Sequence, residues 1–161
     1  MLTLGRLAPG ERLVDLGCGD GRLLRSAVAD FGAQGAIGYE LDPSLVRIAL
    51  EAAAAEGLDG TGESDTGGNI ARVVVREADA HQAGADGALA SADLVTLYLS
   101  TQGNAALLPM LRRELRPSAR VVSFHWEMPD ELKPARVARM QSRAAVYLYE
   151  GIGERGGGGV G

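Results

Sequence analysis

The sequence of 161 residues is poor in the side chains that build disulfide-bonded and metal-bound proteins. It contains one cysteine, Cys18, and two histidines, His81 and His125. A single cysteine excludes a disulfide framework or a cysteine-based metal cluster within one chain, and two histidines are too few for a convincing zinc site. We therefore expect no metal site and a fold that depends on its hydrophobic core.

Long apolar runs and aromatic side chains are scarce as well. No uninterrupted apolar stretch approaches the roughly 18 residues of a membrane helix, and residues 1–10 lack the pattern of a signal peptide. Aromatic residues make up 4% of the chain and hydrophobic residues 46%, so the core must be mainly aliphatic. These features predict a cytoplasmic protein of one domain without a membrane partner.

Basic residues are outnumbered by acidic ones. The 16 lysine and arginine residues stand against 21 aspartate and glutamate residues, which gives a net charge of −5. Binding to a nucleic-acid backbone requires a basic face, so this balance argues against a nucleic-acid partner. Nothing in the sequence indicates an oligomeric state.

Short apolar runs alternate with helical patterns along most of the chain. Five runs predict strands and two more can pair as a hairpin: 12–16, 36–41, 71–76, 92–99 and 120–126, then 136–140 and 144–150. Helical periodicity covers 22–31, 43–56 and 104–115, although Pro109 leaves the start of the third helix open. Alternating strands and helices imply an α/β fold. We expect a Rossmann-like three-layer sandwich, in which a mostly parallel seven-stranded sheet ends in an antiparallel hairpin.

Two glycine-rich stretches fall outside this alternation. Residues 57–69 are polar and lack periodicity, which predicts a flexible loop. Residues 151–161 have the composition of a disordered tail. The predicted domain therefore covers residues 1–150.

The most specific motif follows the first predicted strand, where residues 14–21 read Val-Asp-Leu-Gly-Cys-Gly-Asp-Gly. Glycines at this place permit a tight turn and let a ligand approach the backbone. The dinucleotide fingerprint is G-x-G-x-x-G, whereas here the third glycine, Gly21, comes one residue early and Arg22 follows it. This spacing suits a ligand without a pyrophosphate. A glycine-rich turn without a ligand is the alternative.

Two acidic residues follow the next two strands. Glu40 ends the second strand, 19 residues after Gly21, and its carboxylate can accept hydrogen bonds from both hydroxyls of a ribose. Asp79 follows the third strand and can accept from an exocyclic adenine amine, while the backbone N–H of Ala80 can serve a ring nitrogen. A strand-ending acid and a turn-forming aspartate are the structural alternatives.

The fourth strand begins near Asp93 and leads into further candidate residues. Ligands of open α/β sheets lie outside the carboxyl ends of the strands, so we expect Leu99, Ser100 and Thr101 close to the reacting group. Tyr98 lies at the same place, with a core aromatic as the alternative.

His125 and Trp126 end the fifth strand at the same edge of the predicted sheet. They are candidates for a substrate contact, with packing as the alternative. Cys18 lies between two glycines and has no basic neighbour in sequence, so we do not expect it to act as a nucleophile.

Taken in order along residues 1–150, these motifs resemble the class I S-adenosyl-L-methionine (SAM)-dependent methyltransferases. The segment 15–21 resembles the family's first motif, Glu40 its ribose-binding acid and Asp79 its adenine-binding acid. Residues 115–120, Leu-Arg-Pro-Ser-Ala-Arg, resemble its Leu-Lys-Pro-Gly-Gly turn. The resemblance implies SAM as cofactor, S-adenosylhomocysteine as product, and a glycine loop close to the methionine part of SAM.

A closer likeness is visible in five segments: 13–22, 38–43, 107–115, 120–123 and 146–149. They are similar to the lysine methyltransferases that modify the ATP synthase c-subunit and the adenine nucleotide translocase, and to prokaryotic relatives of these enzymes. This likeness implies N-methylation of a protein lysine. In familiar members further N-terminal residues help to cover the cofactor, so here either such residues precede Met1 or the pocket is more open.

The resemblance implies a set of site residues, without a general base among them. The cofactor-binding residues are Asp15, Gly17, Cys18, Gly19, Gly21, Glu40, Leu41, Asp79, Ala80 and Leu99. The candidates for contact with the methyl acceptor are Tyr98, Ser100, Thr101 and His125.

Other functions stay open or are disfavoured by single positions. A small-molecule methyltransferase, or a non-catalytic SAM-binding subunit that needs a partner, would share the same motifs. A nicotinamide dehydrogenase would have a glycine in place of Arg22. An adenine N6 methyltransferase would show Asp/Asn-Pro-Pro-Tyr where this chain has Tyr98 and Leu99, and a cytosine C5 enzyme would need a cysteine outside the first motif.

Overall fold

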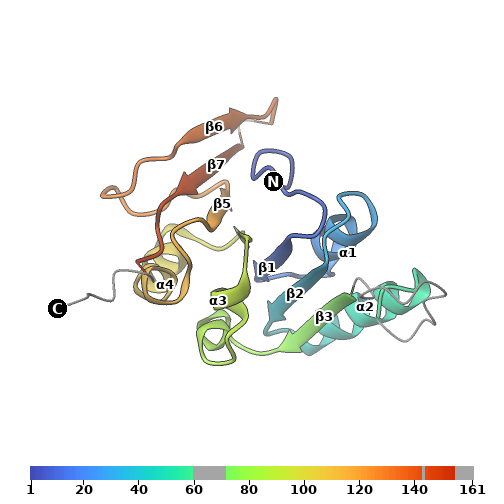
Figure 1. Cartoon of the computed structure of the whole chain (residues 1–161). Helices are drawn as coiled ribbons and strands as arrows, with labels where there is room; N and C mark the ends of the chain where they lie inside the picture. The colour runs from blue at the N-terminus through green and yellow to red at the C-terminus, as the bar shows by residue number, and fades with distance from the viewer. Residues whose placement is uncertain (60–71, 143, 155–161) are drawn as a thin grey trace.

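The computed structural model describes residues 1–59, 72–142 and 144–154. Seven strands form one sheet in the order β3-β2-β1-β4-β5-β7-β6 (Figure 1). They are β1 (Arg12–Leu16), β2 (Gly35–Glu40), β3 (Arg72–Glu77), β4 (Leu94–Leu97), β5 (Arg120–Phe124), β6 (Arg136–Arg139) and β7 (Ala145–Glu150). The first five pair in parallel, and β7 is antiparallel to both β5 and β6. The expected sheet and its terminal hairpin are confirmed.

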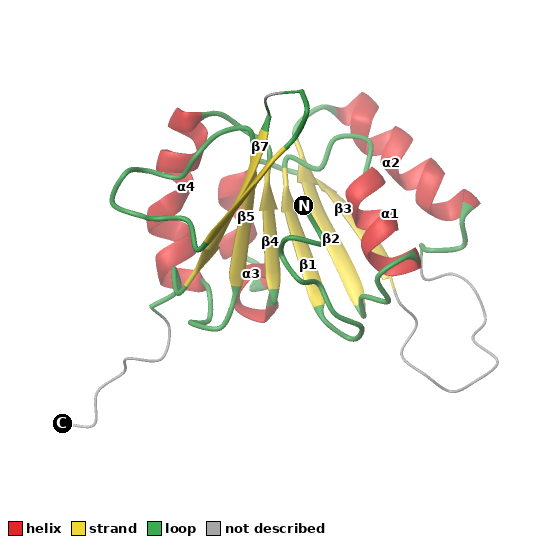
Figure 2. Cartoon of the chain, turned by 90° about the horizontal axis from the view of Figure 1, so that it is seen from above, coloured by secondary structure: helices red, strands yellow, loops and turns green. Residues whose placement is uncertain are grey.

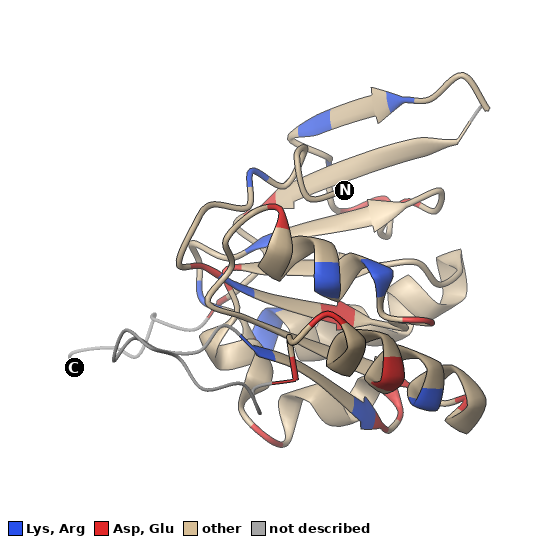
Figure 3. Ribbon diagram, turned by 90° about the vertical axis from the view of Figure 1, so that its right-hand side faces the viewer, with Lys and Arg blue, Asp and Glu red and all other residues tan. Residues whose placement is uncertain are grey.

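Helices cover both faces of the sheet, which gives the three layers that the sequence predicted (Figures 1 and 2). On one face lie α1 (Arg22–Ala29) and α2 (Pro43–Ala55). On the other lie a short 3-10 helix, η1 (Ala80–Gly84), then α3 (Ala88–Ser91) and α4 (Thr101–Glu114). Acidic and basic residues are interspersed over the outer elements (Figure 3), so the apolar faces of the helices are left to the interior.

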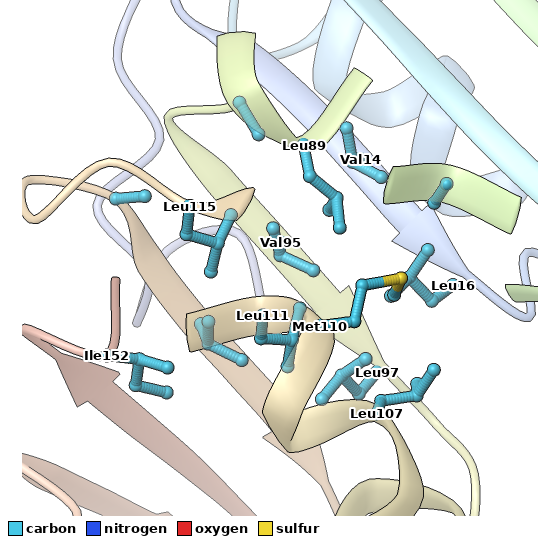
Figure 4. Packing of buried hydrophobic residues seen from close by; sticks show 14 of the residues in the cluster. Val14, Leu16, Leu89, Val95, Leu97, Leu107, Met110, Leu111, Leu115 and Ile152 are labelled. Carbon is cyan, nitrogen blue, oxygen red and sulfur yellow. The ribbon is translucent and has the colours of Figure 1, made fainter. Parts of the chain in front are cut away.

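The core consists of two clusters, one on each face of the sheet. In β1, Leu13 packs with the α1 side, whereas Val14 and Leu16 pack with the α4 side. Successive side chains of a strand point to opposite faces, so a strand covered on both faces is mainly apolar, and the buried Asp15 is the exception in β1. Figure 4 shows Leu107 and Leu111 of α4 directed toward this second cluster.

Helix α4 begins three residues before the predicted start at Asn104. The side chain of Ser100 caps it by accepting a hydrogen bond from the N–H of Gly103 at 3.0 Å, and such a cap fixes where a helix begins. Pro109 lies inside the helix, not at its start. The predicted start was therefore wrong because the serine cap was overlooked.

Strands β4 and β5 are shorter than predicted, and η1 and α3 were not predicted at all. Strand β4 covers Leu94–Leu97, because Ala92 ends α3 at one side and the chain turns toward the Ser100 cap at the other. Strand β5 ends at Phe124 because His125 has a positive φ of 70°. That backbone conformation is incompatible with a continuing strand.

Other boundaries agree with the sequence within a residue or two. Asp42 caps α2 by accepting from the N–H of Ser44 at 2.8 Å, with Pro43 in the first turn, as predicted. Of the predicted loop 57–69 and tail 151–161, residues 60–69 and 155–161 lie outside the described residues.

Gly38 in β2 provides a test of how tightly α1 packs on the sheet. A Cβ atom there would lie 2.5 Å from Cys18 Sγ and 2.6 Å from Leu24 Cδ1. Overpacking a buried site of this kind costs about 1–3 kcal/mol, so we expect Gly38→Ala to lower the free energy of unfolding by that amount in urea denaturation. Gly35→Ala in the same strand is the control, since its Cβ would approach nothing closer than 3.4 Å. Equal losses in both variants would contradict this packing.

Candidate functional site

The carboxyl ends of the parallel strands meet at one edge of the sheet. The chain runs from β1 to β2 on one side of β1, whereas β4 pairs with β1 on its other side. The strand order therefore reverses between β1 and β4. At such a reversal the connections leave in opposite directions and open a crevice, which is where ligands bind in open α/β sheets.

The loop that leaves β1 is fixed to the end of β2 by its backbone. The N–H groups of Gly17 and Cys18 both donate to the carbonyl oxygen of Tyr39, at 2.9 and 3.0 Å. The N–H of Gly19 donates to Oε2 of Glu40 at 2.9 Å. The turn is thus held at three successive positions by two residues of the neighbouring strand.

Gly17, Gly19 and Gly21 of this loop all have a positive φ, but the space around each of them differs. A Cβ at Gly17 (φ 86°) would lie 3.1 Å from Leu99 Cδ2, whereas a Cβ at Gly19 (φ 56°) would meet nothing within 4 Å. A Cβ at Gly21 (φ 69°) would lie 2.9 Å from the Cβ of Ala49 in α2. Gly21 therefore allows α1 and α2 to pack closely, and Gly19 leaves the backbone open to a ligand.

Two hollows lie along this edge. The β2–β3 hollow, of about 340 Å³, is lined by Gly17, Tyr39, Glu40, Leu41, Ala78, Asp79, Ala80, His81, Tyr98, Leu99, Gly103 and Leu107. The glycine-loop hollow, of about 460 Å³, is lined by Met1, Asp15, Gly17, Cys18, Gly19, Asp20, Arg22, Leu23, Leu45 and Tyr98. Because both share Gly17 and Tyr98, they form neighbouring halves of one crevice.

Glu40 lies where the two halves meet. Its Oε1 accepts from the N–H groups of Leu41 and Asp42 at 2.9 and 3.0 Å, and its Oε2 accepts from Gly19. These bonds fix the carboxylate at the end of β2, beside Leu41, whose side chain is 65% exposed. A fixed carboxylate beside an exposed apolar side chain can take the two hydroxyls of a sugar and one face of its base.

Asp79 lies at the far end of the β2–β3 hollow. Its Oδ1 accepts from the backbone N–H of His81 at 2.8 Å and lies 2.7 Å from the Nδ1 of that residue. The hydrogen bond from the His81 N–H, together with the imidazole, lowers the pKa of Asp79 below its ordinary value. An ionised carboxylate here can accept from an amino group on a planar base.

Asp15 lies under the glycine-loop hollow and is 5% exposed. The hydroxyl of Thr96 donates to its Oδ1 at 2.6 Å. Burial raises the pKa of Asp15 to about 7, the Thr96 hydrogen bond opposes that rise, and the charge of Glu40 adds to it. The hollow therefore has a carboxyl group that can change its charge near neutral pH.

Cys18 is a packing residue of the same loop. It is 6% exposed, and its Sγ lies over Gly38 of β2. Burial, together with the charges of Asp15 and Glu40, raises the pKa of its thiol to about 12. A thiol with so high a pKa is a poor nucleophile near neutral pH, in agreement with the expectation from sequence.

Several predicted residues lie outside both hollows. Ser100 caps α4, and Gly21 packs against α2. Thr101 and His125 line a separate hollow of about 560 Å³ beyond β5. Asp93 lies at the opposite end of the sheet, where it accepts from the N–H of Arg12 and pairs with Arg116.

Sequence reasoning overlooked Tyr39 and Thr96. Tyr39 accepts both loop N–H groups through its carbonyl, lines the β2–β3 hollow, and donates its hydroxyl to Asp86 at 2.6 Å. Thr96 lies directly across from Asp15 in the pairing of β1 with β4. A polar residue within the apolar run 92–99 was the available signal, but its partner depends on strand register.

Comparison with known proteins places this architecture. The model of a family described as the ANTKMT methyltransferase domain matches residues 15–136. A curated protein of Saccharolobus islandicus (strain REY15A), named protein-lysine N-methyltransferase, is 34% identical over 158 residues, which cover 96% of this chain and 87% of that protein.

Solved structures of methyltransferases have a similar fold. The crystal structure of an RNA methyltransferase from Salinibacter ruber in complex with S-adenosyl-L-homocysteine matches with a TM-score of 0.78 and 31% identity, over 93% of this chain and 86% of that chain. TrmN from Thermus thermophilus matches with a TM-score of 0.73 at 18% identity, over 93% of this chain and 46% of that chain, which supports the fold alone.

The sheet, the glycine loop and these matches define a SAM-dependent methyltransferase. The chain belongs to the family described as the ANTKMT methyltransferase domain. Its crevice suits SAM, because the open backbone at Gly19 and the fixed carboxylate of Glu40 can take the methionine part and the ribose. None of the helices within residues 1–59, 72–142 and 144–154 is long and apolar enough to cross a membrane.

Glu40 is the first residue to test in the cofactor site. We expect Glu40→Ala to weaken binding of S-adenosylhomocysteine by about 10–100-fold, because hydrogen bonds to a charged group each contribute about 1.5–3 kcal/mol. Calorimetric titration measures the change. Glu51→Ala is the control, since Glu51 lies exposed on α2 and pairs with Arg47. Similar affinities in the two variants would contradict the assignment of Glu40.

The raised pKa of Asp15 predicts a pH-dependent stability. Folding raises this pKa from 3.8 to about 7, so the folded protein keeps a proton that the unfolded chain loses between these values. The contribution of Asp15 to the free energy of unfolding therefore falls as the pH rises through this window and stays low above it. We expect the stability of Asp15→Asn, relative to the parent, to increase from pH 4 to pH 8 in urea denaturation. A constant difference would contradict the prediction.

Proposed function

We propose that the chain transfers the methyl group of SAM to the amine of lysine side chains in proteins. The observation that carries this proposal is the 34% identity to the Saccharolobus islandicus protein-lysine N-methyltransferase, which extends over nearly the whole of both chains. The match to the ANTKMT methyltransferase domain supports it, because that match includes the glycine loop, Glu40, Asp79 and the strand ends that form the crevice.

The reaction sets clear demands on the chain. When bound, SAM supplies a methyl group on a positively charged sulfur. The lone pair of an uncharged amine forms the new N–C bond while the S–C bond breaks, and the sulfur keeps that electron pair as the thioether of S-adenosylhomocysteine. The protein must hold the amine in line and free of its extra proton. Such alignment can contribute about 7–11 kcal/mol.

Tyr98 is the best-placed side chain for the acceptor. It leaves β4 at the junction of the two hollows and is 60% exposed. Its ring packs edge-on against Phe124, with the ring centroids 4.9 Å apart and an interplanar angle of 81°. An aromatic wall at this point can enclose the aliphatic part of a lysine, and removal of water from the amine favours its uncharged form.

His81 and Asp79 are poorly suited to act as the base. They are already bonded to each other at the far end of the β2–β3 hollow. Deprotonation by desolvation, with bulk water as the proton acceptor, therefore fits this site better than a dedicated side-chain base.

RNA is the second candidate acceptor. The Salinibacter ruber protein, at 31% identity, is described as an RNA methyltransferase. The net charge of −5 and the interspersed charges of Figure 3 favour the protein acceptor, since backbone contacts to RNA rely on clustered basic residues.

Incubation with methyl-labelled SAM tests the proposal. We expect label to enter lysine residues of protein substrates, located by peptide mass spectrometry, with no label in RNA or in a small-molecule extract. Tyr98→Ala should lower the rate at saturating SAM by about tenfold or more because the acceptor loses its aromatic wall, whereas Tyr98→Phe should keep most of the rate.

Glu40→Ala serves as the control for this assay, because it should weaken cofactor binding without changing which acceptor is labelled. Label in RNA alone would contradict the proposed protein acceptor and would identify RNA as the acceptor. Label confined to a small molecule would overturn both.

A further inference from the structure

The hollow beyond β5, here called the β5 hollow, lies along the same edge of the sheet as the crevice. Its volume of about 560 Å³ exceeds that of either half of the crevice. It shares no lining residue with those halves in the described part of the chain. Its polar and aromatic lining side chains are Thr101, His125, Trp126, Glu127, Asp130 and Tyr147. The cofactor site therefore leaves this space free for another ligand.

A row of aromatic rings connects the crevice with the β5 hollow. The ring of Tyr98 lies 4.9 Å from that of Phe124, measured between the centroids. The rings of Phe124 and His125 are 6.4 Å apart, and those of His125 and Trp126 are 4.6 Å apart. An acceptor whose lysine reaches Tyr98 can therefore extend along this row into the hollow.

The wall of the hollow is fixed before any acceptor binds. The amide of the buried Asn104 donates to the carbonyl oxygens of Trp126 and Glu127, at 3.0 and 3.1 Å. The hydroxyl of Tyr149 accepts from the N–H of Met128 at 3.0 Å. Helix α4 and strand β7 thus hold the chain that leaves β5 from two sides, which lowers the entropic cost of binding there.

The charge of the hollow favours a cation. Glu127 and Asp130 contribute exposed carboxylates to the wall, and neither forms an ion pair with a residue of the described chain. Burial and the charge of Glu127 together raise the pKa of Tyr147, with Arg139 of β6 opposing the rise, so this carboxylate lies beside the Tyr147 ring. No lysine or arginine among the described residues lines the hollow.

The shape of the lining favours a long basic side chain over a small ion. Trp126 is 40% exposed and Tyr147 is half-buried, so both can offer ring surface to a ligand. A guanidinium or ammonium group packs on aromatic rings while its aliphatic stem covers apolar surface. Carboxylates beside the same rings then pair with its charge.

We propose that the β5 hollow is a second contact site for the acceptor protein, where it binds an arginine or lysine two or four positions from the methylated lysine. This role rests on the proposed methylation of protein lysines. Side chains of an extended peptide alternate between its two sides, so an even spacing directs both toward the same edge of the sheet. Two to four extended residues span roughly 7–14 Å, which suits the length of the aromatic row.

Methylation of short extended peptides with one central lysine tests this role. One series carries arginine two or four positions from the lysine, on either side. The matched series carries citrulline there, which has the shape of arginine without its charge. With the full chain and SAM, we expect kcat/KM for at least one arginine peptide to exceed that of its citrulline match by about fivefold or more, mainly through a lower KM.

Variants of the two carboxylates locate the preference in the hollow. In Glu127→Gln/Asp130→Asn, which keeps the shape of both side chains, the ratio of arginine to citrulline peptide should fall below about twofold. Glu131→Gln is the matched control, because Glu131 lies in the same connection, 3.8 Å from Arg112, and does not line the hollow. This control should keep the parent ratio.

A charge reversal and a binding measurement complete the test. Glu127→Lys/Asp130→Lys should prefer a peptide with glutamate at the flanking position, because opposite charges are then paired again. The affinity for S-adenosylhomocysteine, measured by calorimetric titration, should equal that of the parent in every variant. An equal affinity shows that the fold and the cofactor site are intact.

The outcomes separate this role from the proposed function. Equal kcat/KM for arginine and citrulline peptides in the parent would overturn the role of the hollow and leave lysine methylation in place. A parent-like ratio in Glu127→Gln/Asp130→Asn would overturn it too. If only whole proteins are labelled, mapped lysines without a basic residue two or four positions away would do the same. No label in any lysine would overturn the proposed function and this role with it.

Discussion

The hydrogen bonds that close the glycine loop onto the end of β2 are the constraint on which the rest of the site depends. The carbonyl of Tyr39 takes two N–H groups of the loop and the carboxylate of Glu40 takes a third. The loop therefore cannot move independently of β2. A ligand that enters the crevice meets donors, acceptors and an open backbone whose positions are set before binding, which lowers the entropic cost of ordering the site.

The reversal of strand order between β1 and β4 brings elements from both faces of the sheet to one crevice. The glycine loop leads into α1 on one face, while Tyr98 and the cap of α4 lead to the other. Gly17 and Tyr98 lie where these connections separate, and both residues line both hollows. The proposed methyl transfer therefore falls at the part of the edge that both hollows share.

The carboxyl groups of the site differ in their burial and in the number of hydrogen bonds that they accept. Glu40 and Asp79 accept backbone N–H groups near the surface, whereas Asp15 is buried with a single hydroxyl donor. A carboxyl group kept in a poorly solvated place weakens the folded state when it is ionised. Such a cost is typical of binding sites, where a group is arranged for its ligand rather than for the fold.

The sequence by itself determined the layered fold, the glycine loop and the acids at the ends of β2 and β3, because these depend on local periodicity and on spacing along one strand–loop–helix unit. The tertiary structure alone decided that Thr96 faces Asp15 and that His125 lies in a separate hollow. It also decided that Tyr98 joins the two halves. Strand register and the convergence of distant loops arise from pairing across the sheet, and no pattern within a single segment specifies them.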